Sequence, residues 1–200
     1  MAISRRAYQE TILEIMPEQG DWEDTEYLWL TDRSRRLIEY ADGEVEVLPM
    51  PTATHQWIVF FLGRRFFDAL SPQGGIALLS PLRLRLGDRK FREPDLLALR
   101  DRHDPRYGDR YWHGADLVVE VVSADDPARD LVTKRREYAA AGIPEYWIVN
   151  PLDRTVTVLT LQAGVGAFSE HGIFRAGGVA TSVLLPGFAV VVDEIFAELD

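Results

Sequence analysis

The stretch DLVVEVVSADDPARDLVTKRREYAAAGIPEYWIVN, residues 116–150, predicts a strand, a helix and a second strand in succession. Its first part, DLVVEVVS, is almost wholly apolar and β-branched, which is typical of a central strand buried on both faces. Residues 127–141 predict a helix, because Pro127 suits a first helical turn and Gly142 suits a helix end. EYWIVN follows at once as the second strand. This order predicts a sheet with a helix packed against it.

The segments on either side extend this pattern. Residues 36–49, RLIEYADGEVEVLP, alternate apolar and polar side chains around Asp42-Gly43, a dipeptide preferred in tight hairpin turns. The other predicted elements are a first helix capped by Ser4, a helix after Thr54 that extends to Leu70, strands at 82–86, 95–99 and 154–161, short β segments, and a terminal helix at 191–200. We therefore expect an α/β or α+β fold, with a central mixed sheet flanked by helices, an extra N-terminal hairpin and a β-rich C-terminal segment.

Composition predicts a single domain over residues 1–200, because a chain of this length with 46% hydrophobic residues can bury a sizeable core. Cysteine is absent, which excludes disulfides, a thiolate nucleophile and a cysteine zinc site. No apolar run approaches the ~20 residues that a membrane helix requires, and the N-terminus lacks the apolar stretch of a secretory signal. We therefore expect a cytoplasmic protein that does not enter a membrane.

Charge argues against a protein that binds nucleic acid over its whole surface. The chain has 22 basic and 32 acidic residues, a net charge of -10. Residues 83–110 differ, because basic side chains outnumber acidic ones there. A local basic stripe on an acidic body can steer a polyanion to one place, and scattered surface arginines are the alternative interpretation.

Glu120 is the unexpected residue of the predicted central strand, because burying an unpaired carboxylate costs several kcal/mol. Asp95 directly follows Pro94 at the start of another strand, and two adjacent strands would bring both carboxylates to the same end of the sheet. Two carboxylates with retained waters suit Mg²⁺, or Mn²⁺, and the carbonyl of Val121 would add a third protein ligand. The alternatives are a structural ion pair for Glu120 and a turn acid after proline for Asp95.

Lys134 is the third candidate, because the chain contains two lysines among its 22 basic residues. A sequence with such a preference for arginine retains lysine where a compact charge or a titratable base is needed. Lys134 lies on the helix after the Glu120 strand, one turn beyond Asp130. A surface Asp130-Lys134 helix pair is the alternative.

These segments resemble the Uma2 family of restriction-endonuclease-like proteins. In that family a Pro-Asp, a Glu-Val-x-Ser strand, an Asp-x-x-x-Lys helix and a Tyr-Trp-x-Val strand recur in this order, and residues 92–99 and 116–151 contain all four. The resemblance spans roughly residues 37–159 and implies the restriction-endonuclease-like fold of the PD-(D/E)xK nucleases. It also implies that Asp95 and Glu120 bind the metal while lysine orients or activates the attacking water. The superfamily pattern places the lysine two residues after the glutamate, where this chain has Val122, so Lys134 would reach the same point from the helix.

The resemblance extends to the hairpin, where Glu44 and Glu46 project to the same face of a strand. Glu44 would add a catalytic acid near the metal, and a solvated strand face is the alternative. We therefore expect a Mg²⁺-dependent endonuclease that hydrolyses phosphodiester bonds of DNA by a metal-activated water. The alternatives are a catalytically inactive module that binds a partner or itself, and a hydrolase of another phosphoester. A homodimer formed through the β-rich tail from Phe168 onward is also expected.

Overall fold

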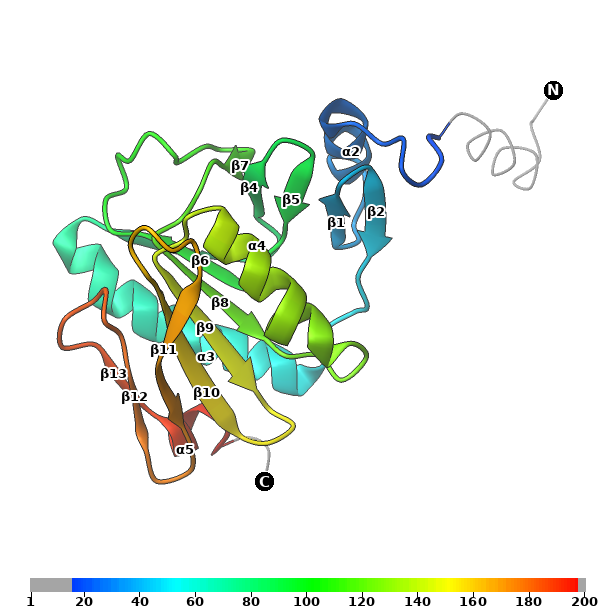
Figure 1. Cartoon of the computed structure of the whole chain (residues 1–200). Coiled ribbons are helices and arrows are strands. Elements are labelled where there is room, and N and C mark those ends of the chain that lie inside the picture. The colour runs from blue at the N-terminus through cyan, green and yellow to red at the C-terminus, as the bar shows by residue number, and fades with distance from the viewer. Residues whose placement is uncertain (1–15, 198–200) are drawn as a thin grey trace.

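The computed structural model describes residues 16–197, so the helix predicted from Ser4 lies outside the described part of the chain (Figure 1). The helices are α2 (Asp24–Thr31), α3 (Ala53–Leu70), η1 (Ser71–Gln73), η2 (Arg129–Lys134), α4 (Arg135–Ala140) and α5 (Val192–Ile195). The strands are β1 (Ile38–Ala41), β2 (Glu44–Val47), β3 (Ile76–Leu79), β4 (Arg83–Gly87), β5 (Lys90–Arg92), β6 (Leu96–Leu99), β7 (Tyr111–Trp112), β8 (Leu117–Val121), β9 (Glu145–Asn150), β10 (Thr155–Leu161), β11 (Phe168–Phe174), β12 (Val179–Thr181) and β13 (Ala189–Val191).

A six-stranded mixed sheet forms the centre of the molecule, with the strand order β11-β10-β9-β8-β6-β3. The strands β8 and β9 are parallel, whereas the remaining neighbours are antiparallel. A parallel pair requires a crossover connection, and the helix that continues from η2 into α4 supplies it. The predicted succession of strand, helix and strand over residues 116–150 is therefore confirmed.

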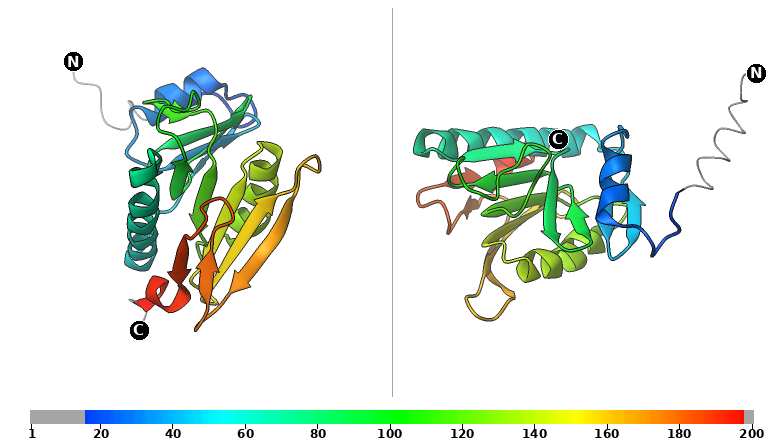
Figure 2. Two further views of the ribbon diagram at one scale, coloured as in Figure 1. Left: turned by 90° about the vertical axis from the view of Figure 1, so that its left-hand side faces the viewer. Right: turned by 90° about the horizontal axis from the view of Figure 1, so that it is seen from above.

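Helices cover both faces of this sheet, because alternate residues of a strand point to opposite sides. Val119 belongs to the same core cluster as Leu62 of α3, whereas Val118 belongs to the same cluster as Tyr138 of α4. Figure 2 shows α3 and α4 on opposite sides of the strands. The alternation places Glu120 on the α4 side of β8, which is the side from which the helix contributes its lysine.

A second, five-stranded sheet with the order β2-β1-β5-β4-β7 packs beside the first. The prediction of one central sheet was therefore incomplete, because β4, the strand expected at 82–86, belongs to this second sheet. The hairpin is confirmed: β1 and β2 pair around Asp42 and Gly43, whose φ angles are 54° and 93°. The strands β3, β5 and β7 were not predicted. A two-stranded sheet of β12 and β13 completes the β-rich tail.

Two helix predictions require correction. The helix α3 begins at Ala53 rather than after Thr54, because the Thr52 side chain caps it by accepting a hydrogen bond from the His55 N–H at 3.2 Å. The terminal helix predicted over residues 191–200 is one turn, Val192–Ile195, within the described range. No helix in residues 16–197 has the length and apolar character needed to cross a membrane.

Candidate active site

A small pocket of ≈ 40 Å³ lies where the carboxyl end of β8, the start of β6 and the N-terminal end of α3 meet. Its ionisable lining residues are His55, Glu93, Asp95, Glu120, Arg129, Asp130 and Lys134. The sequence predicted that Asp95, Glu120 and Lys134 would meet, and all three line this pocket. The carboxyl end of β8, the first turns of α3 and the start of the 127–140 helix lie together on the right-hand side of Figure 1.

Strand register brings the two predicted metal ligands to the same end of the sheet. The strands β6 and β8 are antiparallel with Leu96 opposite Val119, so the next position outward sets Asp95 opposite Glu120. The Val121 N–H donates to Asp95 Oδ2 at 2.8 Å, which fixes the aspartate against the end of β8. The side chain of Glu120 is 3% exposed and that of Asp95 is 14% exposed. Asp95 therefore faces the opening, while Glu120 lies deeper.

Lys134 enters the pocket from the helix and meets three carboxylates. Its Nζ lies 3.0 Å from Glu120 Oε1, 3.1 Å from Glu39 Oε1 and 3.3 Å from Asp130 Oδ1. Residues 129–134 form a π-helical turn, a feature that is frequent at functional sites. The surface helix pair, considered from sequence as the alternative, is excluded because the Lys134 side chain is 4% exposed.

Glu39 and Glu93 are buried acidic residues that sequence reasoning missed, and Glu39 is the one that contacts Lys134. It is fully buried on β1 and accepts hydrogen bonds from the Glu93 N–H at 3.2 Å and from Arg92 Nη1 at 3.0 Å. It thereby joins the five-stranded sheet to Lys134. Glu39 could have been found by the signal that identified Glu120, namely an acid within an apolar run, which for Glu39 is LIEYA.

The predicted acid Glu44 is not brought into this pocket. Its residue is exposed on β2, and in the register of the hairpin it pairs with Ala41. Glu46 on the same strand lies 3.2 Å from Arg129, an ion pair at the rim of the pocket. Glu44 is therefore exposed to solvent, as the alternative interpretation from sequence proposed, while Glu46 contacts a residue of the pocket wall.

His55 and Tyr138 hold the two strand carboxylates from opposite sides. His55 Nε2 lies 3.2 Å from Asp95 Oδ2, and the Tyr138 hydroxyl donates a short hydrogen bond to Glu120 Oε1. Burial alone would lower the pKa of His55, but the hydrogen bond and charge of Asp95 outweigh burial and raise the pKa. His55 Nδ1 is buried without a hydrogen-bond partner among the described residues. Each carboxylate therefore has a dedicated donor that restricts its orientation.

Buried acids outnumber the cations at the centre of the pocket. Burial raises the pKa of Glu120 well above its usual value, and the charges of Asp130 and Asp95 raise it further against the opposing effect of Lys134. Burial also raises the pKa of Asp130. Burial alone would lower the pKa of Lys134, but the surrounding carboxylates, Glu120 first, raise it well above its usual value. Lys134 is therefore a charged ammonium, and its single charge does not balance the acids around it.

The donor set suits a divalent metal with few protein ligands. Within residues 16–197, no three His, Asp or Glu side chains converge on one point as a preformed metal cluster. Mg²⁺ does not require such a cluster, because it is usually held by one or two carboxylates and keeps several waters. Asp95 and Glu120 would supply those carboxylates, and a cation beside them would oppose the burial and the neighbouring negative charges that raise the pKa of Glu120.

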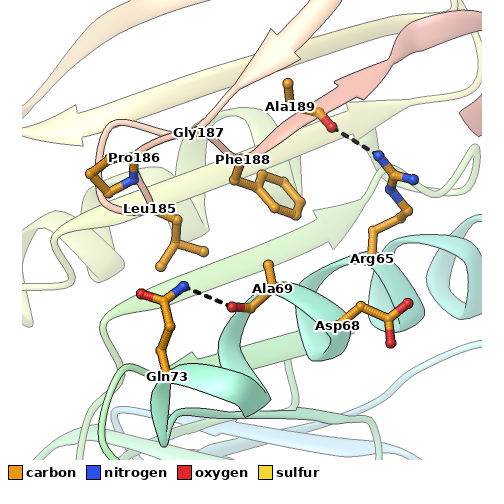
Figure 3. Close-up of a pocket in the computed structure, with 9 residues that line it drawn as sticks. All are labelled: Arg65, Asp68, Ala69, Gln73, Leu185, Pro186, Gly187, Phe188 and Ala189. Carbon is orange, nitrogen blue, oxygen red and sulfur yellow. Dashed lines mark hydrogen bonds between the residues drawn. The ribbon is translucent and has the colours of Figure 1, made fainter.

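A larger pocket of ≈ 400 Å³ lies away from these residues, between the C-terminal half of α3 and the loop before β13 (Figure 3). Two of its polar side chains form hydrogen bonds with backbone carbonyls. Arg65 Nη2 donates to the Ala189 carbonyl at 3.1 Å, and Gln73 Nε2 donates to the Ala69 carbonyl at 2.9 Å. Asp68 is the one acid in its wall. This pocket has no combination of acid and base comparable to that around Lys134.

Comparisons with known proteins agree with this geometry. A crystal structure described as "a putative nuclease belonging to DUF820 from Anabaena variabilis ATCC 29413" has the same fold, with a TM-score of 0.73 and 19% sequence identity over 90% of this chain and 99% of that chain. No curated protein matches the chain. The Uma2 family model, described as "Putative restriction endonuclease", matches residues 22–193. The predicted fold class is confirmed, and the chain belongs to the Uma2 family.

Proposed function

We propose that this protein is a Mg²⁺-dependent endonuclease that hydrolyses phosphodiester bonds of DNA, and that Mn²⁺ can replace Mg²⁺. The observation that supports it most strongly is the meeting of Asp95, Glu120 and Lys134 in one pocket, although they are distributed over 40 residues of sequence. Membership of the Uma2 family, described as "Putative restriction endonuclease", supports the same reaction.

Asp95 and Glu120 would hold the metal, and the carbonyl of Val121 at the end of β8 is the proposed third ligand. The ion supplies Lewis acidity at a phosphoryl oxygen and lowers the pKa of a bound water. His55 and Tyr138 keep the two carboxylates in place through their hydrogen bonds, so the ligands are positioned before the ion arrives.

Lys134 would place a compact positive charge beside the reacting phosphate. Because carboxylates raise its pKa, it is protonated at neutral pH, and we assign it to orienting the attacking water and stabilising negative charge on the phosphoryl oxygens rather than to removing a proton. Water attacks phosphorus and releases its proton to solvent, the bond from phosphorus to the leaving oxygen breaks, and that oxygen takes up a proton from solvent.

One observation favours the second candidate, a restriction-endonuclease-like module without catalysis that binds a partner or itself. The Lys134 ammonium already has three carboxylate partners, which is a satisfied structural arrangement. The β-rich tail offers a surface for self-association, because Ile173, Val179, Val183 and Val191 are exposed there. A homodimer formed through this tail is compatible with either candidate.

Calorimetric titration of Mg²⁺ and Mn²⁺ into the wild type and Glu120→Gln, followed by a nicking assay on supercoiled plasmid, separates the candidates. An active nuclease binds metal and nicks DNA, and Glu120→Gln loses both. Lys134→Ala should abolish nicking while retaining metal binding, and Arg135→Ala on the exposed side of the same helix is its matched control. Metal binding without nicking would indicate another phosphoester substrate, and no binding would leave the non-catalytic module.

A further inference from the structure

A groove of ≈ 690 Å³ adjoins the small catalytic pocket and shares part of its wall. Three segments line it, within residues 49–55, which include the start of α3, and within residues 122–125 and 151–154. His55 and Ser123 belong to the walls of both the groove and the pocket. The groove lies beyond the carboxyl ends of the parallel strands β8 and β9, a place where ligands commonly bind in open α/β sheets. A substrate that reaches the pocket from this side passes through the groove.

The chemically important side chains are recessed from the groove. Glu120 is 3% exposed and Lys134 is 4% exposed, and the pocket around them holds ≈ 40 Å³. Regular duplex DNA is stiff, and bending or kinking it costs free energy. An unpaired strand bends freely, so it can insert one phosphodiester into a narrow recess. The geometry therefore favours a substrate whose backbone has left the regular double helix.

Two apolar tips stand at the edge of the groove. Met50 is 75% exposed between Pro49 and Pro51, and Leu152 is 57% exposed after Pro151. Proline fixes its own φ angle, which restricts the backbone around both tips. Methionine, leucine and proline are among the apolar side chains that nucleic-acid-binding proteins place against partly unstacked bases. The flat face of an unstacked base is the apolar surface that these tips would cover.

The charges of the groove also fit an unpaired strand better than a duplex. Arg154 is its one arginine, and Asp125 is an acid in the same wall. Duplex binding relies on many phosphate contacts by basic side chains, and this wall does not offer them. A strand held through its bases needs fewer cations, because contacts to the face of a base contribute affinity without charge.

We infer that the groove binds an unpaired polynucleotide strand, with one base against Met50 and Leu152 and the adjoining phosphodiester in the pocket beside Asp95 and Lys134. This inference rests on the proposed nuclease function and specifies its substrate. Single-stranded nucleic acid, or a duplex that contains an unpaired segment, is the substrate class that this arrangement recognises.

The test compares fluorescein-labelled oligonucleotides of one sequence as single-stranded DNA, single-stranded RNA, intact duplex and gapped duplex, with Mg²⁺ present. Anisotropy measures binding and gel electrophoresis measures cleavage. We expect unpaired strands to bind at least about tenfold more tightly than the intact duplex. Met50→Ser and Leu152→Ser should each weaken that binding, by up to the roughly 5- to 100-fold that loss of an aromatic contact to a base costs. Val165→Ser, at an exposed site outside the groove, is the control and should bind as the wild type does.

Preference for either unpaired DNA or unpaired RNA supports the inference and identifies the sugar. Equal or tighter binding of the intact duplex overturns it, as does unchanged binding in both groove variants. If the wild type nicks plasmid and Glu120→Gln does not, but no preference for unpaired strands is found, the nuclease function stands and the groove assignment fails. If unpaired strands bind through Met50 and nothing is cleaved with Mg²⁺ or Mn²⁺, the groove assignment stands and the nuclease function fails.

Discussion

Replacing Lys134 with methionine removes the positive charge at the centre of the buried cluster while keeping a side chain of similar length. The Nζ atom contacts oxygens of Glu39, Glu120 and Asp130 at 3.0–3.3 Å, and all three carboxylates are at most 5% exposed. Removing one partner of a buried ion pair costs about 3–5 kcal/mol, because the other partner stays buried without compensation. We expect Lys134→Met to lower the free energy of unfolding by that amount, and Tm by roughly 6–20 °C for a domain of this size.

The loss should depend on pH with a defined sign. Burial first, and the neighbouring acids next, raise the pKa of Glu120 in the folded protein, and removing the ammonium raises it further. A carboxyl group with a raised pKa in the folded state stabilises the fold while it is protonated, and this stabilisation is lost as the pH rises through its folded pKa. The difference between Lys134→Met and the wild type should therefore be smaller at pH 5 than at pH 8.

Urea denaturation of both proteins at pH 5 and pH 8 measures this difference. Arg135→Met is the matched control, because it removes a positive charge from an exposed neighbouring position and should cost less than ~0.5 kcal/mol. Adding Glu120→Gln to Lys134→Met removes one uncompensated acid and should recover part of the loss. A Lys134→Met protein within ~1 kcal/mol of the wild type at pH 8, or one more strongly destabilised at pH 5, would refute the buried-charge reasoning.

Burial and a neighbouring carboxylate raise the pKa of Glu93 to about 7, so its stabilising effect is complete below about pH 4.5 and is lost as the pH rises through 7. Glu93→Gln should therefore flatten the decline in unfolding free energy between pH 5 and pH 8, and an unchanged slope in urea denaturation would contradict this. Gly43→Ala should lower Tm more than Gly177→Ala. Both glycines have a positive φ, but only at Gly43 would an added Cβ lie 2.1 Å from a backbone oxygen. Equal decreases in Tm in the two variants would rule out this close approach. If the β-rich tail forms a homodimer, Val179→Glu should sediment as a monomer in sedimentation velocity, while the control Val165→Glu should remain a dimer. A wild-type protein that is monomeric at micromolar concentration would refute the dimer proposal.

The local pattern of the sequence was sufficient to predict the elements around residues 116–150. The apolar, β-branched run that forms β8 and the proline and glycine at the helix ends act over a few residues, so they can be recognised without the rest of the chain. The same local logic identified Glu120 and Lys134, because an acid in an apolar strand and a rare lysine are unusual wherever the chain folds. Asp95 was identified by its place after Pro94, at the start of a neighbouring strand. These three residues line one pocket, and the two acids lie at the same end of the sheet on adjacent strands, as the sequence predicted.

Tertiary structure alone decided which other residues meet them. Glu39 and Glu44 lie on the same face of the hairpin, yet Glu39 reaches Lys134 while Glu44 is exposed, because β1 lies between β2 and β5 whereas β2 is the edge strand of the sheet. The division of the strands into two sheets likewise depends on contacts between distant segments, such as the pairing of β1 with β5. The amino-acid sequence by itself determined the central strands, the helix between them and the three unusual side chains, since those depend on local chemistry. The partners that neutralise Lys134 and the groove that leads to it were decided by packing, since they come from segments far apart in the chain.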